Sequence, residues 1–140
     1  MATNPLDNFT NKAFQVFGHE GSAEYYRRLK EERTLCGTRC SDCAHVALPP
    51  RSFCPACFAA EVEWVSVGEH ATLHAFTTQS RALRFMKPAV IGVVSIPDVG
   101  LMMAPIGAPM AELAIGQPLR LEILDLEAGF SVPQFVPLEV

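Results

Sequence analysis

Five cysteines in one short segment are the residues of this chain best suited to chemistry. They all lie in residues 36–58, CGTRCSDCAHVALPPRSFCPACF, and the rest of the 140-residue chain contains none. Two CxxC pairs stand out, and they consist of Cys40, Cys43, Cys54 and Cys57. Each pair can place two thiolates on one ion, and two facing turns give a tetrahedral set of sulfurs. The spacing therefore predicts a Zn²⁺ site; iron in a rubredoxin-like site and metal-free redox thiols are the alternatives.

The number of sulfur ligands limits what the predicted ion could do. A site closed by four protein ligands has no position open for water or substrate, so we expect structural rather than catalytic zinc. The cysteine segment is too short to bury a hydrophobic core of its own, and its folding should depend on the ion. Pro49 and Pro50, between the two pairs, stiffen the hairpin that brings them together.

Two other residues near the pairs could take part. Cys36 falls outside the CxxC pattern, and we expect a buried thiol there; an alternative ligand or a redox partner is the other interpretation. His45, two residues after Cys43, is a second alternative ligand. The sequence indicates no base held beside any cysteine and contains no GxSxG, phosphate-binding glycine loop or HExxH motif. We therefore predict no catalytic residue in this chain.

Composition and charge exclude several classes of protein. Hydrophobic residues make up 49% of the chain, which is enough to bury a core. The formal net charge is −4, whereas proteins that bind a phosphate backbone are usually basic, so a nucleic-acid-binding ribbon and barrel is the weaker alternative. The N-terminus has no signal-peptide pattern, and the longest apolar run, residues 89–96, is too short to span a membrane. We expect a cytoplasmic protein with no membrane partner, where clustered cysteines bind metal more often than they form disulfides.

The segments around the cysteines predict helices first and strands afterwards. Ser22 precedes a periodic run that ends at Leu35, which predicts a helix with Ser22 as its N-cap. The aromatic residues between Phe9 and Phe17 predict an earlier helical turn or hairpin arm. After the cysteines, alternating and β-branched segments predict strands at residues 64–79 with a break at Gly68, 89–96, 101–106, 116–126 and 129–137.

These short strands indicate one kind of architecture. Five strands without a βαβ rhythm, with a turn or short helix near residues 109–114, predict a small OB-like barrel; a β-sandwich is the alternative. Pro133 and Pro137 predict that the last strand lies at an edge, because proline cannot donate to a ladder.

A basic loop connects two of the predicted strands at residues 80–88, SRALRFMKP. Its cations Arg81, Arg84 and Lys87 stand beside apolar side chains, which would suit the phosphates and pantetheine arm of CoA or an acidic patch on a partner. Loops of OB folds often bind ligands. Three interpretations remain: a solvated loop, a CoA contact and a partner contact.

The order of these parts resembles the family of zinc-ribbon, OB-fold proteins associated with acyl-CoA metabolism. The resemblance covers residues 22–128 and rests on the segments CSDC, LPPRSFCPAC, EVEW, VGEHATLHAFTT, AVIGVVSIPDVGLMMAPI and IGQPLRLEIL. It implies a mainly β fold with N-terminal helices, in which a rubredoxin-like zinc ribbon is followed by an OB-fold barrel. The implied domains are a helical arm at 1–35, the ribbon at 36–62 and the barrel at 63–140.

The implied metal ligands are Cys40, Cys43, Cys54 and Cys57, and the chain departs from the family pattern beside them. Family turns often carry glycine directly after the second cysteine of a pair, where the backbone favours positive φ. Here alanine and phenylalanine stand at those two positions, Ala44 and Phe58.

The resemblance also implies a non-catalytic role. Family members resemble partners of thiolase-superfamily enzymes, or of related aldolases and hydratases, and help to build the acyl-CoA site of the partner. We therefore expect a hetero-oligomer with a thiolase-like catalytic subunit that binds most of the CoA or acyl-CoA, and no activity of the isolated chain. Among subtypes, the chain resembles the small zinc-finger subunits of benzoylsuccinyl-CoA thiolases, which implies CoA-dependent cleavage of a β-ketoacyl-CoA. An aldolase or hydratase subunit and a stand-alone rubredoxin-like redox protein are the alternatives.

Overall fold

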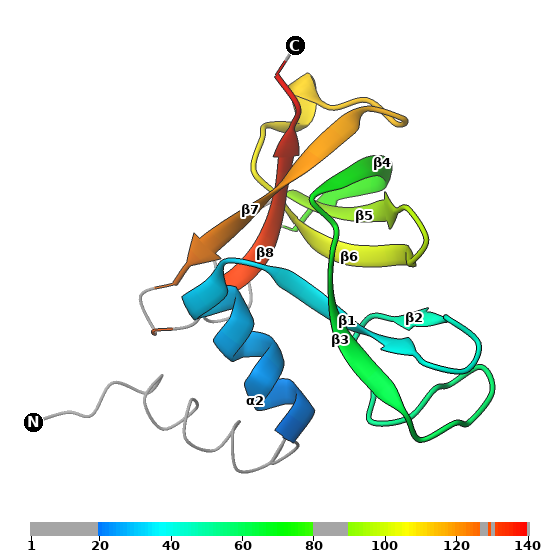
Figure 1. Cartoon of the computed structure of the whole chain (residues 1–140). Coiled ribbons are helices and arrows are strands. Elements are labelled where there is room, and N and C mark those ends of the chain that lie inside the picture. Colours follow the sequence, from blue (N-terminus) through cyan, green and yellow to red (C-terminus); the bar gives the residue numbers. More distant parts are fainter. Residues whose placement is uncertain (1–19, 80–89, 127–128, 130, 140) are drawn as a thin grey trace, which may run out of the picture.

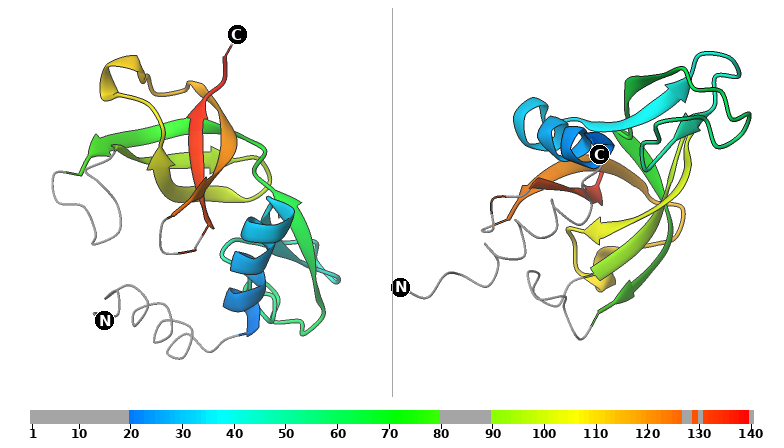
Figure 2. Two further views of the ribbon diagram at one scale, coloured as in Figure 1. Left: turned by 90° about the vertical axis from the view of Figure 1, so that its left-hand side faces the viewer. Right: turned by 90° about the horizontal axis from the view of Figure 1, so that it is seen from below.

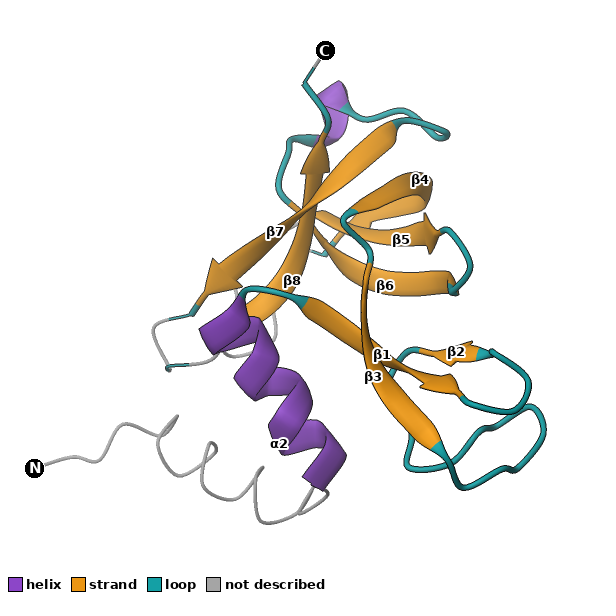
Figure 3. Ribbon diagram, in the orientation of Figure 1, coloured by secondary structure: helices purple, strands orange, loops and turns teal. Residues whose placement is uncertain are grey.

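A computed structural model describes residues 20–79, 90–126, 129 and 131–139 of the chain (Figure 1). Two β units follow one helical segment, and the three-stranded unit projects from the barrel in every view (Figures 1 and 2). The elements, shown by type in Figure 3, are α2 Glu20–Arg27, a π-helical turn η1 Arg28–Glu32, β1 Leu35–Cys40, β2 Val46–Ala47, β3 Val62–Val67, β4 His70–Thr78, β5 Val90–Ile96, β6 Gly100–Ile106, a 3₁₀ turn η2 Met110–Glu112, β7 Pro118–Asp125 and β8 Ser131–Pro137.

The helical segment begins earlier than predicted. Ser22 lies inside α2 and is not its N-cap, because the helix already begins at Glu20. The helix therefore includes Gly21, and a glycine within a helix lowers its stability by only about 1 kcal/mol relative to alanine. The segment ends at Arg33, whose φ of 57° and N–H bond to the Arg28 carbonyl turn the chain into β1. The earlier turn predicted between Phe9 and Phe17 lies outside the described residues.

The first β unit is a three-stranded antiparallel sheet in the order β2-β1-β3. Strand β1 pairs with β3 along its whole length, from Leu35 opposite Val67 to Cys40 opposite Val62. Strand β2 approaches β1 so closely that a Cβ on Gly37 would lie 2.5 Å from the Ala47 carbonyl oxygen. Glycine is therefore needed at this point of the sheet. The domain boundary expected between residues 62 and 63 falls at the start of β3 and stays a prediction.

The second β unit is a closed five-stranded barrel in the order β4-β5-β6-β8-β7. This confirms the OB-like barrel and rules out the β-sandwich alternative. The break predicted at Gly68 is also confirmed, since β3 ends at Val67, β4 begins at His70, and Gly68 has a φ of 75°.

The prediction of an edge position for the last strand is wrong, because β8 lies between β6 and β7 in the barrel. The physical reason lies in the direction of its backbone groups. The backbone groups of Phe135 point toward β6, since its carbonyl accepts a bond from the N–H of Gly107, the residue after β6. Pro133 and Pro137 lie two residues before and after Phe135, so the N–H groups that they lack would also have pointed toward β6. Strand β8 pairs with β6 at one position only, Ile106 opposite Phe135, so that few ladder bonds are lost.

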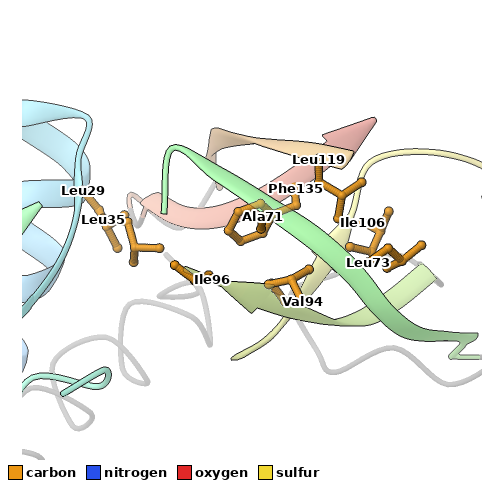
Figure 4. Packing of buried hydrophobic residues seen from close by; sticks show 10 residues of the cluster. Leu29, Leu35, Ala71, Leu73, Val94, Ile96, Ile106, Leu119 and Phe135 are labelled. Atoms are coloured by element: carbon orange, nitrogen blue, oxygen red, sulfur yellow. The ribbon is translucent and has the colours of Figure 1, made fainter. Parts of the chain in front are cut away.

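The hydrophobic core extends from the barrel into the helical segment and the first strand. Leu29 of η1 and Leu35 of β1 are fully buried and lie next to Ile96 at one end of the barrel interior (Figure 4). A Cβ on Gly68 would touch both Leu35 and Ile96, so this glycine lets the two β units approach each other. The other buried members of the cluster are Ala71, Leu73, Val94, Ala104, Ile106, Leu119 and Phe135. No helix within the described part of the chain is long and apolar enough to cross a membrane.

The close approach at Gly37 yields a test of the sheet. Gly37→Ala should lower the free energy of unfolding by about 1–3 kcal/mol, because the new methyl group meets a backbone carbonyl that no side-chain rotation can move away. Denaturant unfolding of the zinc-loaded protein measures the loss. Ser66→Ala on the neighbouring β3 is the control and should change stability little. An unchanged Gly37→Ala protein would contradict the observed pairing of β1 and β2.

Candidate metal centre

Two backbone turns of the same design hold the CxxC pairs. In the first, the Ala44 N–H bonds to the Cys40 carbonyl at 3.0 Å, and the Asp42 N–H points at Cys40 Sγ at 3.3 Å. In the second, the Phe58 N–H bonds to the Cys54 carbonyl at 2.9 Å, and an N–H again points at the first sulfur of the pair, here Cys54 Sγ at 3.4 Å. Each turn thus presents two sulfurs on one side and stabilises their negative charge with N–H dipoles.

The two turns face each other and bring four sulfur atoms together. All four lie within 4.8 Å of one another; Cys40 Sγ is 3.6 Å from Cys57 Sγ, and Cys43 Sγ is 3.5 Å from Cys54 Sγ. Sulfurs bound to one zinc ion at about 2.3 Å in a tetrahedron stand about 3.8 Å apart. Disulfides would need about 2 Å, and all five cysteines are free thiols. The donor set and its spacing therefore fit one Zn²⁺ ion.

Both turns use the backbone conformation that glycine favours, although neither has glycine. Ala44 and Phe58 each have a φ of 64° directly after the second cysteine of their pair. A side chain in this left-handed region costs of order 1–3 kcal/mol. The departure from the family sequence therefore leaves the turn geometry intact and stores strain in it.

Crowding of the thiols separates their pKa values. At Cys54, burial opposes ionisation, but N–H groups of Cys57 and Ala56 outweigh it and lower the pKa to about 6. At Cys57, the Ala59 N–H favours the thiolate, yet the sulfurs of Cys40 and other neighbours outweigh it and raise the pKa to about 12. Four adjacent sulfurs cannot all be negative unless a cation lies among them.

The remaining predicted residues lie elsewhere. Cys36 is buried on β1 and has the Thr34 hydroxyl 3.4 Å from its sulfur; neither it nor His45 belongs to the four-sulfur group. Arg81, Arg84 and Lys87 lie outside the described residues.

The structure adds contacts that the sequence did not indicate. The buried Thr38 hydroxyl accepts a bond from the Arg51 N–H at 2.9 Å and so holds the loop that leads to the second CxxC pair. The Arg28 guanidinium lies 5.2 Å from the centre of the Trp64 ring and bonds to Glu24 at 2.8 Å, which joins the helix to β3. The spacing of four residues between Glu24 and Arg28 could have indicated their pairing on one helix face, whereas the contact of Arg28 with Trp64 depends on the fold.

Removal of one ligand tests the centre. Cys54→Ser should lose zinc and unfold the three-stranded unit, because the fourth ligand completes the shell and metal binding supplies much of the folding free energy. Metal analysis and circular dichroism measure both effects. Cys36→Ser removes a thiol outside the cluster and should keep stoichiometric zinc. Full zinc content in Cys54→Ser would contradict the assignment of this ligand.

The separated pKa values predict the sign of the pH dependence. Because the Cys57 thiol keeps its proton at neutral pH until an ion replaces it, zinc binding should release protons and weaken as pH falls. Each released proton changes log K by about one for every pH unit. Competition with a chromophoric chelator between pH 6 and pH 8 measures the slope. A flat profile would show that the thiols are already ionised without metal.

Comparisons with known proteins agree with this architecture. Residues 27–63 match the family model described as ChsH2, rubredoxin-like zinc ribbon domain, and residues 64–124 match the model described as ChsH2, C-terminal OB-fold domain. A solved structure described as Ltp2-ChsH2(DUF35) aldolase superposes with a TM-score of 0.72 at 20% identity, covering 85% of this chain and 95% of that chain. A DUF35-family protein of unknown function from Sulfolobus solfataricus superposes with a TM-score of 0.60 at 17% identity, covering 97% of this chain and 100% of that one. Likeness at these identities shows the fold alone, whereas the two family models match consecutive segments that together make up most of the chain. The chain therefore belongs to the ChsH2 family of zinc-ribbon, OB-fold proteins.

Proposed function

We propose that this protein is a non-catalytic subunit of an acyl-CoA enzyme complex, in which a thiolase-superfamily partner carries out the reaction. One observation carries the proposal: the chain joins a closed four-sulfur centre to an OB barrel through a shared core. A solved structure with this fold is described as an Ltp2-ChsH2(DUF35) aldolase, which supports a role beside a second polypeptide.

The metal in this proposal is structural Zn²⁺ held by Cys40, Cys43, Cys54 and Cys57. When bound, it supplies two positive charges that hold the four thiolates together. With all four positions taken by sulfur, it offers no site for substrate. The ribbon then acts as a rigid body whose shape, and not whose reactivity, serves the complex.

Two reaction types fit such a complex, and both break the bond between the α and β carbons of an acyl-CoA. In thiolysis, the thiolate of CoA adds to the β-ketone carbonyl, and the carbon–carbon bond breaks. The β carbonyl becomes one acyl-CoA, and protonation of the α carbon gives the second. In aldol cleavage, the β-hydroxyl loses its proton, the same bond breaks to release a carbonyl compound, and protonation of the α carbon then gives the shortened acyl-CoA. The sequence resemblance favours thiolysis of a β-ketoacyl-CoA such as benzoylsuccinyl-CoA, and the likeness to the Ltp2-ChsH2(DUF35) structure favours the aldolase.

The basic loop completes the proposal. Arg81, Arg84 and Lys87 provide cations that complement the phosphates of CoA, and they remain candidates on sequence grounds for a contact with the acyl-CoA held by the partner.

Affinity purification from the native host, followed by mass spectrometry and assays, tests the proposal. We expect a thiolase-superfamily protein to copurify in a fixed ratio, and the isolated chain to show no turnover. The complex should cleave a β-ketoacyl-CoA when CoA is present, or a β-hydroxyacyl-CoA without added CoA; these two results distinguish thiolase from aldolase. Strong turnover by the isolated chain, or a pure preparation that contains no such partner, would overturn the proposal.

A further inference from the structure

Two phenylalanines of the zinc ribbon are exposed side by side. Phe58 follows the second CxxC pair and is 76% exposed, and Phe53 precedes the pair and is 44% exposed. Their rings are stacked with centroids 6.5 Å apart and an angle of 16° between the planes. The pair thus forms an exposed apolar surface on the turn that carries Cys54 and Cys57.

Folding does not account for the ring of Phe58. The residue has a φ of 64°, where a bulky side chain is a genuine outlier and glycine would be free of strain. The ring buries little surface, so it returns little of that cost through packing. Ala44 occupies the equivalent position of the first turn with the same φ and no ring, so the turn itself does not require an aromatic residue.

The charges of the ribbon near these two phenylalanines limit which kind of molecule can bind them. Asp42, in the first CxxC turn, and Glu61, three residues after Phe58, are both exposed, and the Ser41 N–H bond to the Glu61 carbonyl at 3.0 Å ties these two segments of the ribbon together. Four thiolates around one divalent ion add further negative charge, and exposed Arg51 offsets part of it. This field opposes a polyanion such as a nucleic acid, and it opposes the same surface of a second copy. It favours a protein surface with lysine or arginine side chains.

We infer that the Phe53–Phe58 pair anchors the zinc ribbon in an apolar pocket of the catalytic partner, a pocket whose rim carries basic side chains. The inference rests on the proposed function and adds to it the surface that meets the partner. Exposed aromatic residues that enter a pocket carry a large share of the binding free energy at protein interfaces. The Phe58 ring is exposed on this turn despite the strain of its positive φ, so a pocket on a partner could enclose it.

Binding measurements with the copurified catalytic subunit test the inference, with full-length, zinc-loaded chains. Phe58→Gly should weaken binding tenfold or more and at the same time raise the melting temperature, because it removes the ring and the strain together. Ala44→Gly is the matched control: it relieves the same strain in the first turn, should raise the melting temperature and should leave Kd unchanged. Phe53→Ser should weaken binding without this gain in stability. Ile115→Ser, at another exposed apolar residue, should leave Kd unchanged.

Charge variants test the rim of the pocket. Asp42→Lys and Glu61→Lys should each weaken binding of the same subunit, and this loss should shrink at high salt because the salt screens it. A loss that is independent of salt, or no loss, would overturn the basic rim.

The outcomes separate this inference from the proposed function. If the catalytic subunit copurifies but binds Phe58→Gly and Phe53→Ser as it binds the wild type, the proposed function stands and the anchor is wrong. If no such subunit copurifies, the proposed function fails and this inference fails with it. Binding of a labelled single-stranded oligonucleotide that Phe58→Gly abolishes would overturn the protein pocket in favour of nucleic acid. Concentration-dependent dimers that Phe58→Gly abolishes would overturn it in favour of a second copy.

Discussion

Four sulfur atoms within 4.8 Å of one another set the constraint on which the rest of the ribbon depends. Without a cation, the four thiols lose their protons at different pH values. Apart from the metal, few buried side chains hold the two CxxC turns facing each other. Strand β2 has only two residues, and the buried residues between 36 and 61 are Cys36, Gly37, Thr38, Cys40, Ala47 and Cys54, a set with no large aliphatic side chain. The metal centre therefore takes the place of the hydrophobic core that a unit of this size lacks.

Strand β1 connects this centre rigidly to the barrel. It begins at Leu35, which is part of the barrel core, and ends at Cys40, a member of the sulfur cluster. A paired strand of six residues is a stiff connection of about 17 Å. Arg33, just before it, bonds to Asp125 of β7 at 2.6 Å, and Ser131 of β8 bonds to the same carboxylate. The Arg33 guanidinium, more than any other group, lowers the pKa of Asp125, so this contact strengthens the joint where helix, ribbon and barrel meet.

The sequence was most informative where one local pattern determines the structure. The CxxC spacing indicated the sulfur cluster, and alternation with a glycine break indicated the five barrel strands. Predictions that depend on three-dimensional partners were less successful. Ser22 has the side chain of an N-cap but lies inside a helix, and the prolines of β8 suggested an edge because the sequence does not show which neighbour each N–H would meet. The stacked phenylalanines lie close together because of the folded turn, and Arg28 meets Trp64 because the helical segment packs beside β3, neither of which a local sequence pattern shows.

The energies involved explain how the ribbon tolerates two residues at positive φ. A non-glycine residue there costs of order 1–3 kcal/mol, and Ala44 and Phe58 both incur this cost. Structural zinc sites bind with apparent free energies of about 10–16 kcal/mol at neutral pH, and that free energy is also folding free energy. The metal can therefore hold both strained turns with most of its contribution left over. A unit of this size without a metal would have little packing energy to offset the strain of an exposed ring that itself adds almost no packing. In this way the metal centre leaves the surface residues of its turns free to be selected for contacts with other molecules.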